Sequence, residues 1–249
     1  MSTTWGALKN MGDECIDRRI GDLTVYARMN SDEWELASAY DEQVRCVDDL
    51  AWSRYVTVQD DAIEIRPALP DRPVVVRPES PIVILPGRWG RFYFHVPIWA
   101  RFLSTARGKT QLIEEMPTHK LQSTWFGDPV EGELCYSLES RLMREVASDH
   151  DDSNAVCEVT VQNQSKERLR FERICVHVES MRLFAGSGQL WTNELKVTFT
   201  GADQISDLTF RPDPPERAKH PVEVSEPRIA PDSNIFRRSF TLIREITGF

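Results

Sequence analysis

Hydrophobic and polar side chains alternate along most of the chain with a period of two residues. Over residues 23–28, the apolar Leu23, Val25 and Ala27 alternate with polar or larger neighbours. A period of two places successive side chains on opposite faces of a strand, whereas a helix repeats every 3.6 residues. The pattern therefore predicts a mainly β fold. Further alternating or uniformly apolar segments are 33–40, 55–58, 62–66, 74–76, 81–85, 91–96, 98–103, 111–116, 133–140, 156–161, 170–178, 181–184 and 195–199.

Prolines divide this pattern into regions. Pro67, Pro70 and Pro73 fall within seven residues, and they mark a connection because proline fixes φ and lacks an N–H donor. Residues 1–68 are therefore predicted to form an N-terminal β-meander. In residues 69–232, short strands are joined by Pro and Gly turns, which is typical of the antiparallel sheets of a β-sandwich.

The end of the chain has a helical period instead. Phe236, Phe240 and Ile243 would share one face of a helix that Asp232 or Ser233 could cap. We therefore predict a short C-terminal α-helix over residues 233–249, packed on the body of the protein. A partner-binding or membrane-surface helix is the alternative. Apolar residues also recur at helical spacing in two other segments, 41–52 and 138–146, so each of these could form a short helix or a strand.

Composition narrows the class of protein. The chain has 249 residues, 41% of them hydrophobic and 28% charged, so it can bury a core without disulfides or metals. A net charge of -9 argues against nucleic-acid binding. There is neither a signal-peptide pattern nor an apolar run of the about 18 residues that a transmembrane segment needs. Five widely spaced cysteines suit reduced thiols. We expect a soluble, cytoplasmic protein, with a protein partner or a homo-oligomer left open.

One segment, 121–141, gathers aromatic residues, glycines and carboxylates within a few positions. Asp128 and either Glu131 or Glu133 could act as a general acid and base, or could bind a hard cation through oxygen ligands. The structural alternative is a hairpin loop in which Asp128 supplies turn chemistry and Trp125 packs into the core. The side chains of this segment that could contact a ligand are Trp125, Phe126, Tyr136 and Arg141.

Other chemical signatures are absent from the sequence. The histidines do not occur at HxH, HxxH or HxxxH spacing and no CxxC pair is present, so we expect neither a metal site nor a cofactor. His177 lies on a predicted strand, where a core histidine is the ordinary interpretation. No GxSxG elbow or phosphate-binding glycine loop occurs. The members of a Ser-His-Asp triad would meet only in space, so spacing does not test for one.

Two long runs carry a resemblance to a known family. RPVVVRPESPIVILPGRWGRFYFHVPIW and STWFGDPVEGELCYSLESR resemble an uncharacterised bacterial and archaeal family that is known only as a domain of unknown function. The later VTVQNQS and MRLFAGSGQLWTNE are similar to it as well, so the resemblance covers about residues 21–249. TWFGD and GELCY are its most specific elements. The resemblance implies a stand-alone protein, and it supplies no catalytic residues.

The function is therefore unknown from the sequence. The leading hypothesis is a non-enzymatic cytosolic protein that binds a partner or a small ligand through a β-sandwich surface. If alternation exposes Trp89, Arg91 and Tyr93, they would form an aromatic and cationic face suited to a sugar or a protein. The alternative is a hydrolase-type enzyme or a cation-dependent site that uses the carboxylates of 121–141.

Overall fold

The structure, a computed structural model, confirms the mainly β fold. The regular structure of its described residues consists of strands and two short 3-10 turns, Val47–Asp49 (η1) and Val178–Ser180 (η2). None of these described segments is a helix of the length and apolarity needed to cross a membrane. The residues that the structure describes are 4–8, 15–30, 33–40, 44, 46–56, 62–106, 108–130, 132–146, 151–186, 188–201, 206–230, 236–237 and 240–242.

The strands follow one another closely along the chain. The first half contains β1 (Gly6–Leu8), β2 (Ile16–Ile20), β3 (Leu23–Asn30), β4 (Glu33–Tyr40), β5 (Ser53–Val56), β6 (Ala62–Ala68), β7 (Val74–Arg77), β8 (Ile82–Ile84), β9 (Trp89–Pro97), β10 (Trp99–Ala106) and β11 (Lys109–Pro117). The second half contains β12 (Gln122–Phe126), β13 (Glu133–Arg141), β14 (Asn154–Asn163), β15 (Leu169–Val176), β16 (Leu183–Gly186), β17 (Gln189–Thr192), β18 (Leu195–Phe199), β19 (Ser206–Phe210), β20 (Val222–Ser225), β21 (Phe236–Arg237) and β22 (Phe240–Leu242).

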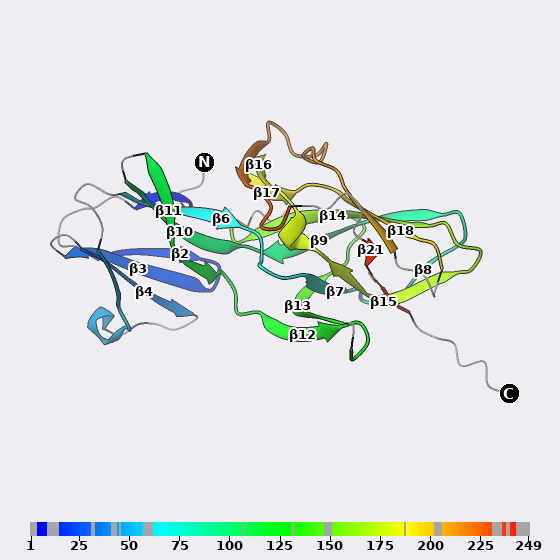
Figure 1. The fold of residues 1–249 in the computed structure, drawn as a ribbon, viewed down its shortest axis with the longest axis horizontal. Coiled ribbons are helices and arrows are strands. Elements are labelled where there is room, and N and C mark those ends of the chain that lie inside the picture. The colour runs from blue at the N-terminus through cyan, green and yellow to red at the C-terminus, as the bar shows by residue number, and fades with distance from the viewer. Residues whose placement is uncertain are drawn as a thin grey trace. The chain divides into compact units, whose positions relative to one another are not determined.

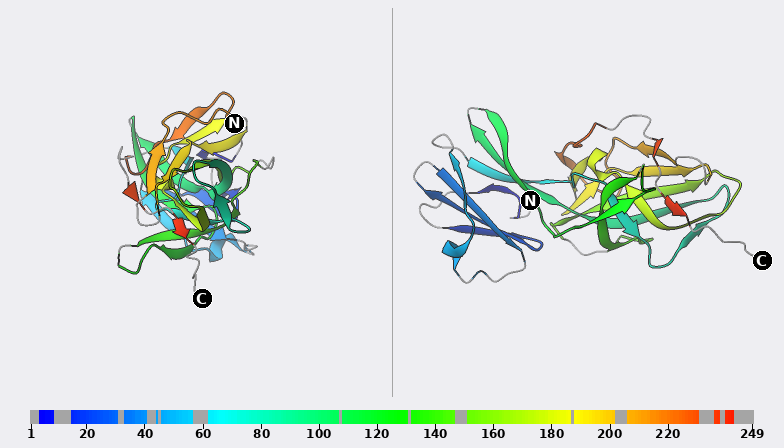
Figure 2. Two further views of the ribbon diagram at one scale, coloured as in Figure 1. Left: turned by 90° about the vertical axis from the view of Figure 1, so that its right-hand side faces the viewer. Right: turned by 60° about the horizontal axis from the view of Figure 1, so that its bottom comes forward.

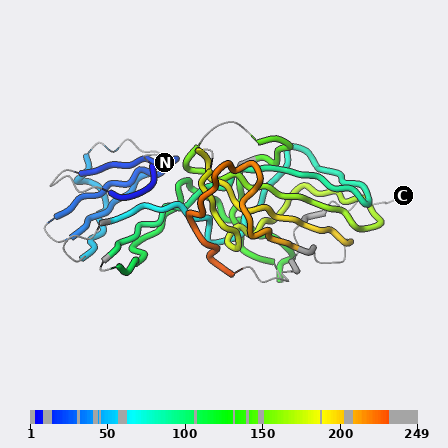
Figure 3. The backbone as a smooth tube through the Cα atoms, turned by 90° about the horizontal axis from the view of Figure 1, so that it is seen from above, coloured from blue at the N-terminus to red at the C-terminus, as the bar shows by residue number. Residues whose placement is uncertain are grey.

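The chain forms two compact units, and it enters the first of them three times. Unit 1 consists of Met1–Ala68, Pro97–Lys120 and Asp151–Ser153, and unit 2 consists of Leu69–Val96, Leu121–His150 and Asn154–Phe249. Figure 3 shows the green strands β10 and β11 returning to the unit that the blue N-terminal strands form. The N-terminal strands are therefore completed by a later part of the chain.

Unit 1 contains two sheets, each of four described strands, in the orders β1-β6-β10-β11 and β2-β3-β4-β5 (Figure 1). Val25 and Leu36 from the second sheet and Ile65 and Phe102 from the first are buried in one hydrophobic cluster. Alternation along each strand directs these side chains to the same interior. The two sheets therefore share a single core.

Unit 2 contains a six-stranded and an eight-stranded sheet, counted over its described strands (Figure 2). The larger follows the order β20-β16-β17-β14-β18-β19-β21, with β9 on β14, and the smaller follows β12-β13-β7-β15-β22, with β8 on β15. The two sheets pack against each other where the ring of Phe92 on β9 meets that of Phe171 on β15 edge to face, with centroids 6.5 Å apart. Both residues are buried.

The sheets of unit 2 are mixed rather than purely antiparallel. Strand β13 runs parallel to β7, and β14 runs parallel to both β17 and β18. Parallel neighbours need a long crossover connection. Between β7 and β13 the chain supplies one by passing through unit 1. The sequence predicts purely antiparallel sheets, because its short turns are typical of hairpins. The parallel pairs correct this prediction.

The C-terminal helix predicted over 233–249 is not found among the described residues of that segment. Phe236–Arg237 is β21 and pairs with β19, and Phe240–Leu242 is β22 and pairs with β15. Phenylalanine and threonine favour strands, and both partner strands offer an edge that this segment completes. Of the two other possible helices, 41–52 contains the 3-10 turn η1, and 138–146 begins within β13.

Candidate metal-binding site

The strands β13, β7 and β15 lie side by side in the smaller sheet of unit 2 and position the candidate site (Figure 1). Glu133 and Cys135 are two residues apart on β13, so both side chains lie on the same face. Cys175 lies on β15, opposite Val75 of β7. Cys135 and Cys175 are fully buried and share one hydrophobic cluster with Val75 and Phe126.

Three possible ligand atoms meet at this point, and we call Glu133, Cys135 and Cys175 the thiol–carboxylate cluster. The two Sγ atoms are 3.8 Å apart, and Cys175 Sγ lies 3.9 Å from Glu133 Oε1. One ligand atom from each of the three residues lies within 4.8 Å of the others. Two sulfurs that are each about 2.3 Å from a tetrahedral zinc ion lie about 3.8 Å from one another. The spacing of the sulfurs therefore fits a shared metal ion.

Two further polar side chains, His177 and Glu179, lie next to the carboxylate of this cluster. The imidazole of His177 directs Nε2 toward Glu133 Oε1, at 3.4 Å, and its Nδ1 toward Glu179 Oε1, at 3.0 Å. His177 and Glu179 are both buried. The carbonyl of Glu179 accepts hydrogen bonds from the N–H groups of Arg228 and Ile229, which fix the turn η2. Glu179 therefore positions His177, and the Nε2 of His177 faces Glu133, as an outer partner of a metal ligand does.

The thiols and the carboxylate differ in exposure. A hydrogen bond with Cys135, together with burial, raises the pKa of Cys175 well above its usual value. With no cation beside it, this sulfur therefore keeps its proton, and a bound metal ion would take the proton's place. The side chain of Glu133 retains 31% of its accessible surface, whereas that of His177 has none. The cluster is therefore approached from solvent on the side of Glu133.

The carboxylates predicted as an acid and base pair are not brought together by the described contacts. Asp128 serves the turn between β12 and β13: its Oδ1 accepts a hydrogen bond from the N–H of Val130, and its carbonyl accepts one from Trp125 Nε1. Glu133 lies in the thiol–carboxylate cluster instead. Glu131 lies outside the described residues.

The predicted ligand contacts of the same segment lie in different surroundings. Trp125 is half exposed, whereas Phe126 is buried against the two cysteines. The hydroxyl of Tyr136 donates to Asp71 Oδ1 at 2.8 Å, and burial, followed by this hydrogen bond, raises its pKa to about 12. Arg141 is exposed and forms an ion pair with Glu79. Of these four candidates, Phe126 is the one that lines the cluster.

A second arrangement, in unit 1, has the connectivity of a hydrolase triad. His119 lies with Nδ1 2.7 Å from Asp22 Oδ2 and with Nε2 2.8 Å from Ser153 Oγ. Ser153 is only 1% exposed, however, and its hydroxyl donates to Asp151 Oδ1 at 2.6 Å. A nucleophile must be reachable and free to give its proton to the base. We therefore interpret these residues as a structural hydrogen-bond network that joins three segments of unit 1, and we call this network the clasp.

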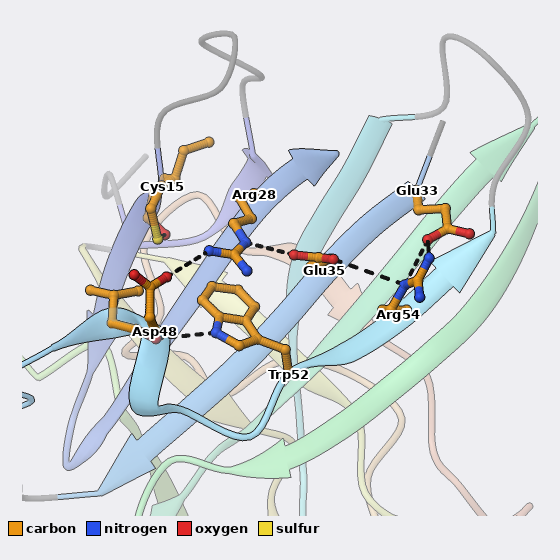
Figure 4. Close-up of polar contacts among 9 residues, drawn as sticks. Cys15, Arg28, Glu33, Glu35, Asp48, Trp52 and Arg54 are labelled. Atoms are coloured by element: carbon orange, nitrogen blue, oxygen red, sulfur yellow. Dashed lines mark hydrogen bonds and ion pairs between the residues drawn. The ribbon is translucent and has the colours of Figure 1, made fainter. Parts of the chain in front are cut away.

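A charged network covers part of the β2-β3-β4-β5 sheet (Figure 4). The guanidinium of Arg28 lies 4.1 Å above the ring of Trp52, and its Nε donates to Glu35 Oε2 at 2.6 Å. This hydrogen bond lowers the pKa of the Glu35 carboxyl. Arg28 also pairs with Asp48, and Arg54 pairs with Glu33. These charges are paired with one another, so the network links β3, β4 and β5 to the turn η1.

Sequence motifs do not identify the two cysteines or His177 as parts of a site. Metal-site motifs place their ligands a few residues apart, whereas Cys135 and Cys175 are 40 residues apart. A usable signal was nevertheless present in Glu-Leu-Cys at 133–135 and Cys-Val-His at 175–177. On a strand, a spacing of two places both polar groups on one face.

The fold and the site together define a mainly β protein of two units with a buried thiol–carboxylate cluster in the second. The chain belongs to the family described as "Protein of unknown function (DUF432)", whose model matches residues 4–244. The resemblance to a domain of unknown function over nearly the whole chain is thereby confirmed. Neither a curated protein nor a solved structure matches the chain. The function of this domain is unknown.

Proposed function

We propose that this protein binds a divalent transition-metal ion of the zinc class through Glu133, Cys135 and Cys175. The observation that carries the proposal is the convergence of the three ligand atoms within 4.8 Å, with the sulfurs at tetrahedral spacing. Thiolate ligands select zinc, iron or copper over magnesium and calcium, which prefer oxygen. The hard-cation site considered from the sequence is therefore the less favoured form.

The polar surroundings support a ligand-binding role over plain packing. Buried thiols alone behave as small hydrophobic groups and need no polar neighbours. Here a histidine and two glutamates, His177, Glu133 and Glu179, are gathered around them, and burying such groups is costly unless they are satisfied. A bound cation would offset the charge of Glu133 and replace the thiol protons.

Three protein ligands would leave a fourth coordination position for water or a small ligand. This position would lie on the side of Glu133, the most exposed of the three. Thiol ligands also need a reducing compartment, and all five cysteines are free, which supports the cytoplasmic location expected from the sequence.

A second candidate function is ligand binding by a sheet surface, for which the exposed indole of Trp89 is the supporting observation. The face expected from Trp89, Arg91 and Tyr93 is not formed, because Tyr93 is buried and Arg91 pairs with Glu158. Trp89 itself borders a groove on the surface of unit 2. In each unit two sheets face a common interior, which supports the predicted β-sandwich arrangement.

Titration of the metal-free protein with Co²⁺ tests the proposal, because Co²⁺ replaces zinc and reports its ligands by absorption. We expect a saturable sulfur-to-cobalt charge-transfer band in the wild type, together with the intense visible bands of a tetrahedral centre. Cys135→Ser and Cys175→Ser should each weaken or remove the band, whereas Cys15→Ser, at an exposed position, should retain it. A band that is absent from the wild type, or unchanged in both variants, would overturn the proposal.

A further inference from the structure

Unit 2 also has a surface groove, which we call the Trp89 groove. Its volume is about 490 Å³, within the range of small-molecule sites. Phe92, Leu142 and Ile84 are buried beneath it, while Val83, Leu85 and Trp89 are about half exposed at its edges. Exposed apolar side chains gathered around a depression indicate a binding surface, whereas single ones are ordinary.

Two arginines give this partly apolar groove a positive charge. Arg88 and Arg144 both line it, and the guanidinium of Arg144 lies 5.0 Å from the centre of the Phe92 ring. The ion pairs formed within the described parts of the chain include neither arginine, whereas Glu79, the carboxylate that lines the groove, pairs with Arg141. A local positive charge is notable on a protein whose net charge is -9.

We propose that the Trp89 groove binds a small amphipathic carboxylate, such as a medium-chain fatty acid. Arginine matches a carboxylate with two parallel hydrogen bonds, and its planar cation suits partly apolar surroundings. The hydrocarbon body would lie along Val83, Leu85 and the indole of Trp89. This site is separate from the thiol–carboxylate cluster, since none of the three cluster residues lines the groove.

The properties of the groove favour one small anion over a larger acidic partner. Its apolar edge would gain from covering hydrocarbon, which an acidic peptide does not offer. Its positive charge comes from two neighbouring arginines rather than from an extended basic surface. The ligand should therefore carry both a carboxylate and a hydrocarbon chain.

Calorimetric titration of the full chain with decanoate, below its micellar concentration, tests this inference. Decanol serves as the ligand without charge, and a short poly-glutamate peptide serves as the acid without hydrocarbon. We expect saturable binding of decanoate with one site, and binding of decanol and of the peptide that is weaker by about tenfold or more. Equal binding of decanol, stronger binding of the peptide, or no saturable binding of decanoate would each overturn the proposal.

Substitution of the two arginines tests whether decanoate binds in the Trp89 groove. The double substitution Arg88→Gln and Arg144→Gln should weaken decanoate binding by about tenfold or more while decanol binding stays the same. Arg168→Gln, at an exposed arginine outside the groove, is the matched control and should bind decanoate like the wild type. Circular dichroism verifies that both variants are folded. Decanoate affinity that is unchanged in the folded double variant would contradict the proposal.

Discussion

The sulfur atoms of Cys135 and Cys175 lie 3.8 Å apart although β7 separates the strands that carry them. Neighbouring strands are about 4.8 Å apart, so β13 and β15 are separated by about twice that distance. The two side chains therefore reach toward each other over β7, where Val75 packs against them. A disulfide needs Cα atoms within about 7 Å. This pair is better placed to share a metal ion than to form a disulfide.

The first prediction concerns Glu179, which contacts His177 beside the thiol–carboxylate cluster. Glu179→Gln keeps an oxygen that can accept from His177 Nδ1 but removes the negative charge that polarises the imidazole. Zinc affinity, measured by competition with a chromogenic chelator, should fall by about 10- to 100-fold. Glu167→Gln, at an exposed position, is the control and should leave the affinity unchanged. Equal affinities in the two variants would show that Glu179 has no role at the site.

The clasp of unit 1 leads to the second prediction. Ser153→Ala removes a hydroxyl that contacts both Asp151 and His119, so it should lower the free energy of unfolding by about 1–3 kcal/mol. Ser123→Ala, at an exposed position, should have little effect. A fluorophosphonate probe should not label Ser153 in the native protein. Labelling that is lost in Ser153→Ala would instead identify a hydrolase.

The third prediction concerns the pH dependence of stability. Burial, followed by the nearby carboxylate of Glu194, raises the pKa of Glu158 above its usual value. The folded state therefore keeps a proton that the unfolded state has already lost, and the stability that this gives is lost as the pH rises from about 4.5 through the folded pKa.

Glu158→Gln cannot titrate, which isolates this effect. Relative to this variant, the wild type should become less stable as the pH rises from about 4.5 toward neutrality. Urea unfolding of both proteins at several pH values gives the difference directly. The Nε of Arg91 remains 2.9 Å from Oε1 of Glu158 and limits the size of the effect. A difference that is independent of pH would contradict the interpretation.

The turn between β12 and β13 gives the fourth prediction. A Cβ atom at Gly132 would lie 2.3 Å from Trp125 Nε1 and 2.6 Å from the carbonyl oxygen of Asp128. Gly132→Ala should therefore destabilise the protein by about 1–3 kcal/mol, because backbone as well as side chain must move. Gly188→Ala is the comparison: its φ is +75°, but no atom lies within 4 Å of the added Cβ. Thermal unfolding should rank Gly132→Ala below Gly188→Ala, and the opposite order would contradict the packing seen at the turn.

Much of the fold could be predicted from alternation alone. Leu23, Val25 and Ala27 are buried on β3 as their period of two implies. The C-terminal segment could not be assigned in this way, because Phe236 and Phe240 fit a helical face as well as two short strands. Its conformation depends on the free edges of β19 and β15, which are features of the folded protein. The parallel pairs depend likewise on crossovers between distant segments.

Part of the candidate site could also be predicted from the sequence. Glu133 and Phe126 belong to the segment that the sequence singled out, since carboxylates and aromatic residues are concentrated there. Their partner Cys175 lies on β15, which pairs with β7 and not with β13, and His177 follows directly after β15. Nothing local to either segment indicates that they meet. The two-residue spacing shows which side chains lie on the same face of a strand. Which faces then come into contact depends on the tertiary structure.

Metal stoichiometry tests the central claim most directly. The reduced protein is equilibrated with a small excess of Zn²⁺, passed through a desalting column and analysed for metal by mass spectrometry. We predict about one zinc ion per chain for the wild type and for Cys15→Ser/Cys46→Ser, which lacks the two exposed thiols. The folded Cys135→Ser/Cys175→Ser variant should retain almost none. A wild type without bound zinc, or a Cys135→Ser/Cys175→Ser variant that retains a full equivalent, would contradict the account.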